Sequence, residues 1–209
     1  MRFNQNTSID CGNLILVPYL KQHVLNYHEW MKSPELQELT CSEPLTVEEE
    51  FQMQKSWLED EDKLTFIVIH RHGVENKEPQ ILHEIAPHHI DEMIGDVNMF
   101  LTEGYEDVEE DLTVQDDANQ QCTTFIQAEL ELMIAKPEFR SKGLGTTIIE
   151  AFLYYIEQSG LLQSKHIAKY IIRVGSKNLP SLRLFKKEGF VQTKYVACFD
   201  QVEMEKTIH

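Results

Sequence analysis

The sequence predicts an α/β fold in which helices flank a mixed, mostly antiparallel sheet. The first observation is residues 128–159, which have the pattern of a strand, a tight glycine turn and a helix. Over 128–135, apolar side chains alternate with Glu and Met, as expected for a strand with two different faces. From Leu144 to Ile156, apolar residues recur every fourth position, as on the buried side of a helix. We expect this unit to be the centre of the fold.

A second strand and helix follow, and they are the other observation behind this fold class. Residues 168–174 read as a strand, and Asn178 is well placed to cap a helix that ends at Gly189. Two further stretches, 190–196 and 202–206, are predicted to close the sheet as a pair of strands.

The first half of the chain supplies the remaining elements. Thr46 and Glu49 form a capping-box pattern at the start of a helix that would place Phe51 in the core. Pro34 is expected to end the preceding helix, and Gly95 suggests a bulge in a strand. The predicted elements are a strand at 14–18, helices at 20–32 and 46–59, and strands at 64–70 and 93–101.

A length of 209 residues suits one domain, 1–209, with inserted loops at about 71–92 and 103–123. Residues 103–121 carry eight acidic and no basic side chains, so we expect them to be mobile. No apolar stretch approaches the length of a membrane span, and the first residues lack an apolar signal core. Together with four well-separated cysteines, this predicts a cytoplasmic protein, with the nucleus as a second location.

The charge is strongly acidic and unevenly distributed. A formal charge of −16 argues against a nucleic-acid binder or a binder of anionic membranes. Residues 78–135 hold 15 Asp and Glu but no Lys or Arg, whereas 12 of the 19 basic residues follow from Lys136 onward. Such a division would suit a protein with an anionic cofactor and a cationic, basic acceptor. The alternative is that acidic solvated loops lie in the first region.

The turn between the central strand and its helix has the chemistry of a phosphate site. Glycines allow close approach of the backbone, and the start of a helix offers free N–H groups and a positive dipole. The pattern is neither a Walker A loop nor a dinucleotide fingerprint, and a glycine turn without a ligand is the alternative. The candidate phosphate-binding residues are Arg140, Ser141, Lys142, Gly143, Leu144, Gly145 and Thr146.

The R-x-x-G-x-G turn, followed by a helix from Asn178 to Gly189-Phe190, resembles the GNAT superfamily of acetyl-CoA-dependent N-acetyltransferases. With a serine three residues after Asn178, at Ser181, the pattern is similar to that of the subgroup that acetylates the N-termini of ribosomal proteins. Residues 17–51 and the stretch Ile94-Gly-Asp-Val-Asn98 resemble the N-acetyltransferase 9 group of that superfamily.

The resemblance implies acetyl-CoA as cosubstrate and a GNAT fold. The sheet would then have a central splay between strands 128–135 and 168–174, into which the pantetheine arm enters. It further implies cofactor contacts from Met133 and Ile134, whose backbone N–H would serve the thioester oxygen, and from Asn178, Ser181 and Phe185. No histidine or cysteine spacing fits a zinc site, so no metal is expected.

Acetylation of an amine requires a base, because an amine attacks only after losing its proton. Glu129 and Glu131 share one face of the central strand, roughly 6.6 Å apart along it. Their repulsion and partial burial would raise a carboxyl pKa. The spacing to Arg140 matches the glutamate base of several GNAT enzymes, which favours Glu129 over Glu131; the alternative is that either is an ordinary exposed strand residue.

One departure from the family pattern concerns the departing thiolate. Many GNAT enzymes protonate it with a tyrosine seven residues after the Asn, but here that position is Phe185. Ser181, water or another group would have to serve, or the step is unassisted. The leading hypothesis is direct transfer of acetyl to a protein or peptide amine, N-terminal or lysine, in a ternary complex. The alternatives are a non-catalytic interaction protein that keeps the CoA-binding fold and, less favoured, a different nucleotide-binding protein.

Overall fold

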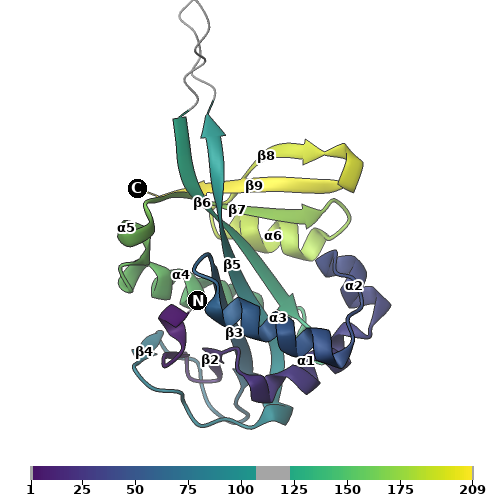
Figure 1. Cartoon of the computed structure of the whole chain (residues 1–209), viewed down its shortest axis with the longest axis vertical. Helices are drawn as coiled ribbons and strands as arrows, with labels where there is room; N and C mark the ends of the chain where they lie inside the picture. The colour runs from purple at the N-terminus through teal and green to yellow at the C-terminus, as the bar shows by residue number, and fades with distance from the viewer. Residues whose placement is uncertain (1, 107–122, 209) are drawn as a thin grey trace, which may run out of the picture.

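The computed structural model describes residues 2–106 and 123–208. In these residues the chain forms a nine-stranded sheet in the order β4-β1-β2-β3-β5-β6-β7-β9-β8 (Figure 1). All neighbours pair antiparallel except β6 and β7, so the predicted mixed, mostly antiparallel sheet is confirmed. The strands are β1 Ser8–Asp10, β2 Leu14–Pro18, β3 Lys63–His70, β4 Gln80–Leu82, β5 Met93–Glu106, β6 Thr123–Ile134, β7 Ile167–Gly175, β8 Val191–Val196 and β9 Gln201–Thr207.

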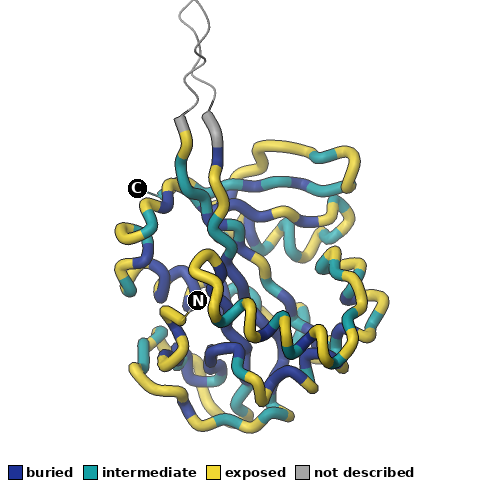
Figure 2. Tube along the Cα trace, in the orientation of Figure 1, coloured by how far each residue is buried: buried dark blue, intermediate teal, exposed yellow. Residues whose placement is uncertain are grey.

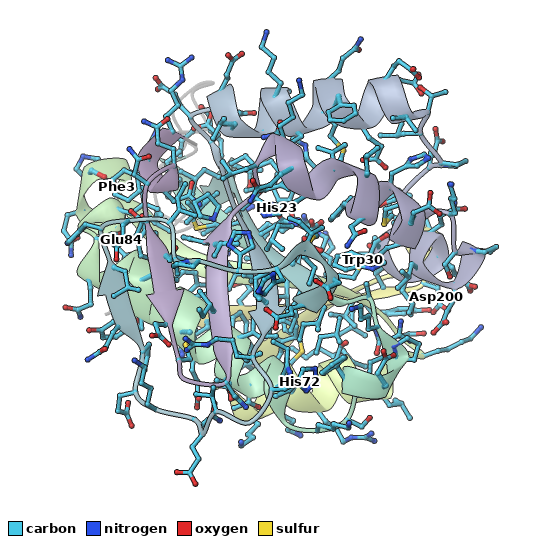
Figure 3. All side chains as sticks on the ribbon, turned by 90° about the horizontal axis from the view of Figure 1, so that it is seen from below. Phe3, His23, Trp30, His72, Glu84 and Asp200 are labelled. Carbon is cyan, nitrogen blue, oxygen red and sulfur yellow. The ribbon has the colours of Figure 1, made fainter. Side chains whose placement is uncertain are left out.

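Helices cover both faces of the sheet. Seen from below in Figure 3, α1 and α3 lie on one side of the sheet, and α4 lies on the other. Two apolar cores result, and Figure 2 shows the buried residues concentrated along the central strands between the helical layers. The helices are α1 Val24–Met31, α2 Pro34–Thr40, α3 Val47–Glu59, α4 Leu144–Gln158, α5 Leu161–Lys165 and α6 Leu179–Lys187.

The single parallel pair, β6 and β7, opens partway along its length. Among the described residues its pairing runs from Ile126 opposite Ile167 to Glu129 opposite Ile171 and then stops. Residues 130–134 remain paired with β5 on their other side. The strands therefore splay at the position that the sequence implied, and one edge of β6 is left without a strand neighbour.

Gly95 permits the close approach of β5 and β6 beside this splay. A Cβ at this position would lie 1.9 Å from the backbone oxygen of Met133 and 3.0 Å from Cα of Ile134. The register between β3 and β5 shifts here: Val68 faces Gly95, but Ile69 faces Met93. The bulge suggested by Gly95 is confirmed, and this glycine is needed because no side chain fits.

Four short elements, α2, β1, β4 and α5, were not expected from the sequence. Helix α1 ends at Met31, before Pro34, as expected, but Pro34 also lies in the first turn of α2, where proline's missing N–H costs nothing. Within the predicted loop 71–92, β4 pairs with β1, and α5 follows α4 after Gly160. All four are too short to produce a clear period in the sequence.

The buried face of α3 is polar, so the prediction that Phe51 is a core residue was only partly right. Phe51 is half-buried, whereas Glu50 and Gln54 are the buried side chains. Gln54 donates a hydrogen bond of 2.9 Å to the carbonyl of Tyr19, and Glu50 lies 3.8 Å from His28. The carbonyl of Tyr19, just after β2, thus compensates for the burial of Gln54, which the pattern of α3 alone does not predict. The capping box of Thr46 is confirmed.

Most of the acidic segment 103–121 lies outside the described residues, so its predicted mobility is not tested here. Residues 103–106 belong to the end of β5. Across the described ranges, none of the helices is long and apolar enough to cross a membrane.

Candidate active site

A cleft of about 390 Å³ opens where β6 and β7 separate. Its walls are α2, the end of β6, the turn before α4 and the start of α6. Eight of the residues predicted from the sequence to contact the cofactor line this cleft: Met133, Ile134, Arg140, Ser141, Gly143, Gly145, Asn178 and Ser181.

The turn before α4 has the geometry of a phosphate site. Gly143 has φ 80° and Ser141 has φ 58°, so the chain curls tightly before the helix begins. The N–H groups of a first helical turn have no intrahelical partner, and here they lie beside the cleft. A Cβ on Gly145 would lie 3.0 Å from Cδ1 of Leu184, so its absence lets α4 and α6 approach closely. These features fit a pyrophosphate group.

Arg140 is held more firmly than its place in a turn suggests. Its Nε donates to the carbonyl of Ile134 at 2.8 Å, and a second nitrogen donates to the carbonyl of Ala135 at 3.2 Å. A third nitrogen forms a 2.6 Å ion pair with Glu35 of α2. The guanidinium therefore satisfies the carbonyls at the end of β6 and ties α2 to the mouth of the cleft.

Asn178 caps α6 as predicted, and its side-chain oxygen accepts a hydrogen bond from the N–H of Ser181 at 3.3 Å. Pro180 lies in the first turn of α6. The cap fixes where α6 begins, so Asn178, Pro180 and Ser181 all reach the cleft.

The other four predicted cofactor residues do not line the cleft. Leu144 and Phe185 are buried in the α4-side core, and the Phe185 ring packs edge-on against Phe190 at 5.3 Å. α4 and α6 turn these two apolar side chains inward, so a cofactor contact at either position would come from the backbone. The Nζ atom of Lys142 lies 5.7 Å from the ring centre of Phe139. The side chain of Thr146 is hydrogen-bonded to that of Glu188.

The α2 wall of the cleft was missed by sequence reasoning. Glu35, Leu36, Leu39 and Thr40 lie along it. The sequence signal for this helix was Ser33 followed by Pro34, a pair typical of a helix start. In the structure, the Ser33 side chain accepts a hydrogen bond from the N–H of Leu36.

Two carboxylates of β6 lie on its α1/α3 side, in different surroundings. Glu129 forms an ion pair with Arg173 of β7, and Arg173 also donates to Glu203 of β9 at 2.9 Å. Glu131 is exposed to solvent, although neighbouring protein atoms still remove part of its hydration. Burial, and secondarily repulsion by Glu129, raise the Glu131 pKa, while Lys63 opposes that rise. Glu131 thus combines a raised pKa with access to solvent, two features of a candidate base.

Beside Glu131 lie two buried charged residues that sequence reasoning did not select. Lys63 of β3 is 4% exposed and Asp96 of β5 is 2% exposed. The register places Asn98 opposite both Thr65 and Glu131, so these side chains share one face of the sheet. The signal was an acid and an amide alternating with apolar residues in a buried strand, Asp96-Val-Asn98.

A splayed parallel pair with a glycine turn at its mouth and carboxylates on one face defines a CoA-dependent acyltransferase architecture. Residues 13–191 match the family described as acetyltransferase (GNAT) domain, and the chain belongs to this family of acetyltransferases. An N-acetyltransferase 9-like protein of Schizosaccharomyces pombe is 59% identical, with 98% of each chain covered. The human alpha/beta-tubulin-N-acetyltransferase 9 is 41% identical over 100% of this chain and 86% of its own length.

Solved structures show the same fold at low sequence identity. Spermidine N-acetyltransferase from Vibrio cholerae, in complex with CoA and spermine, has a TM-score of 0.62 and 18% identity, covering 93% of this chain and 95% of its own. Aminoglycoside acetyltransferase AAC(6')-Ib, in complex with coenzyme A, has a TM-score of 0.57 and 17% identity, covering 94% of each chain. The GNAT fold is confirmed. Within residues 2–106 and 123–208, no cluster of side chains could hold a metal ion.

Changing Gly143 to Glu is expected to weaken CoA binding roughly 30-fold or more, because a carboxylate would repel phosphate at the helix start. Calorimetric titration measures this effect. Gly160→Glu is a matched control: it also caps a helix with positive φ and has open space around its Cβ, but it does not line the cleft. Equal CoA affinity in wild type and Gly143→Glu would rule out the phosphate site.

Proposed function

We propose that this protein transfers the acetyl group of acetyl-CoA directly to a protein or peptide amine, N-terminal or lysine, in a ternary complex. The observation that carries the proposal is a base-like carboxylate, Glu131, on the strand that lines the cleft. The names of the human and fruit-fly relatives, alpha/beta-tubulin-N-acetyltransferase 9, support a protein acceptor. An acidic chain suits a basic acceptor in the cytoplasm, with the nucleus as a second location.

The chain's residues divide the work by position. The turn at Gly143 would hold the phosphates of CoA, and the open edge of β6 at Met133 and Ile134 would offer its backbone to the pantetheine arm and thioester. Bound acetyl-CoA supplies the activated acyl group. The carboxylate of Glu131 removes a proton from the acceptor amine, and Glu129 is the second candidate for this role.

The sequence and the surroundings of the two glutamates favour different residues as the base. Spacing to Arg140 favours Glu129, but that side chain is already engaged by Arg173. Glu131 has the raised pKa, so we favour Glu131 as base. Ser181 is the candidate for protonating the departing thiolate, because it lines the cleft and Phe185 has no proton to donate.

Calorimetry with acetyl-CoA, CoA and ATP tests the first half of the proposal. We expect micromolar binding of both CoA species and much weaker binding of ATP. Absence of CoA binding would support the alternative of a non-catalytic interaction protein, which Phe185 favours.

Acetyl transfer to matched peptides tests the second half. A basic peptide with a free N-terminus and no lysine is compared with the same peptide blocked at its N-terminus and carrying one lysine. Mass spectrometry then assigns the acetylated amine. CoA binding without transfer to either peptide would contradict the assignment of a protein amine acceptor.

A further inference from the structure

The α1/α3 side of the sheet contains a compact polar cluster that the proposed reaction has not yet used in full. Lys63, Asp96 and Glu131 come from three adjacent strands, β3, β5 and β6. Asp96 pairs with Met133 and Asn98 pairs with Glu131, so Asp96 and Glu131 are diagonal neighbours on one face. Glu131 therefore shares β6 with Met133, which lines the cleft, and Asp96 lies on the neighbouring strand.

Asp96 is the most enclosed member of the cluster. It is 2% exposed, and one of its carboxyl oxygens accepts a hydrogen bond of 2.5 Å from the side-chain amide of Asn98. Among the described residues, its other oxygen, Oδ1, is buried without a hydrogen-bond partner. A buried carboxyl oxygen without a donor is costly when ionised, so this position favours a carboxyl that can hold a proton.

Lys63 places a cation beside the two carboxyls. Its Nζ lies 3.0 Å from the ring centre of Trp57 and 3.7 Å from that of Phe100. Aromatic faces favour an ammonium group. These contacts leave the Lys63 ammonium little freedom to move.

We propose that Asp96 and Glu131 act as one coupled carboxyl pair that holds at most a single proton, with Lys63 as its counter-charge. The pair, rather than Glu131 alone, then accepts the proton of the acceptor amine. This inference rests on the proposed function, and it assigns Asp96 as a positioning residue that acts through Glu131.

The charges of the cluster balance through the proton transfer. With both carboxyls ionised and Lys63 charged, the three groups sum to −1, and an incoming ammonium brings the total to zero. An N–H bond of that ammonium breaks, an O–H bond forms on the pair, and the free amine remains. The total stays zero, which matters because Lys63 and Asp96 are buried and an uncompensated charge beside them is unfavourable.

The electrostatics of the cluster agree with this arrangement. Burial raises the pKa of Asp96 to about 7, and Glu131 adds to the rise, while Lys63 and Asn98 oppose it. Burial lowers the pKa of Lys63 to about 7 against the pull of Glu131, Asp96 and Asp60. Both groups therefore exchange protons near neutral pH.

The other ionisable groups packed around Asp96 are two tyrosines, Tyr19 after β2 and Tyr27 on α1. Burial, together with the nearby carboxylates of Asp96 and Glu50, raises the pKa of both tyrosines. They therefore stay neutral and do not compete for the proton. Glu50 of α3 lies 3.8 Å from His28, and burial raises the pKa of Glu50 as well.

Carboxyl ¹³C NMR of the purified protein tests the coupled pair without requiring activity. Wild type is expected to show a carboxyl that titrates near pH 7. Asp96→Asn should remove that titration while keeping an oxygen for the Asn98 amide, and Lys63→Met should move it to higher pH because a cation is lost. Glu50→Gln identifies the separate signal of Glu50. A wild type without a near-neutral carboxyl, or a titration that persists in Asp96→Asn, overturns the proposal.

The pH dependence of acetyl transfer gives a second readout. Removing the negative charge of Asp96 should lower the Glu131 pKa, so the acid limb of kcat/KM in Asp96→Asn should move to lower pH with a reduced plateau. A purely structural role would reduce the rate without moving the limb, and that outcome overturns the pairing. Failure of wild type to bind CoA or acetylate a peptide would instead refute the proposed function, and the NMR titration would still decide the pairing.

Discussion

Replacing Glu131 by Gln is expected to lower kcat roughly 100- to 10,000-fold while CoA binding is retained. The change removes the only atoms on this side chain that can accept a proton and preserves its shape. Steady-state kinetics with the peptide acceptor and calorimetry with CoA measure the two quantities. In wild type, kcat/KM should rise with pH through the raised pKa of Glu131, because only the ionised carboxyl accepts a proton.

Two further variants make this result specific. Glu129→Gln is expected to have a smaller effect on kcat, because Glu129 is engaged by Arg173. Glu205→Gln changes another ion-paired strand carboxylate, the partner of Lys169, and should leave kcat unchanged because β9 lies two strands away from β6. A larger loss in Glu129→Gln than in Glu131→Gln would restore Glu129 as the base, as its spacing in the sequence suggested.

Gly95→Ala is expected to lower the free energy of unfolding by at least about 2 kcal/mol and to weaken CoA binding. The new methyl group would lie 1.9 Å from the carbonyl oxygen of Met133, so β5 and β6 must move apart. That movement displaces the backbone of Met133 and Ile134, which line the cleft. Urea unfolding and CoA titration measure the two effects.

Gly175→Ala is the matched control for this change. Gly175 is also a strand glycine, at the end of β7, but nothing lies within 4 Å of its Cβ position. It should therefore unfold at nearly the same urea concentration as wild type. If Gly95→Ala behaves like Gly175→Ala, the close approach at Gly95 does not constrain β6.

The sequence by itself determined the central elements, because each carries a strong local signal. The glycine turn and the apolar stripe from Leu144 to Ile156 predicted α4 close to its observed bounds. The alternation over 128–135 predicted the end of β6, although the strand begins earlier, at Thr123. Asn178 likewise marked the start of α6 by its capping chemistry. Because these elements position them, eight of the predicted cofactor residues line the cleft.

Only the tertiary structure decided which polar groups face one another. Lys63 and Asp96 lie 33 positions apart in the sequence, yet their strands bring them to one face beside Glu131. The ion pair that engages Glu129 depends on Arg173 of β7, and the inward turn of Phe185 depends on the packing of α6. Strand register and burial set these contacts, and both are properties of long-range packing, which local sequence patterns do not contain.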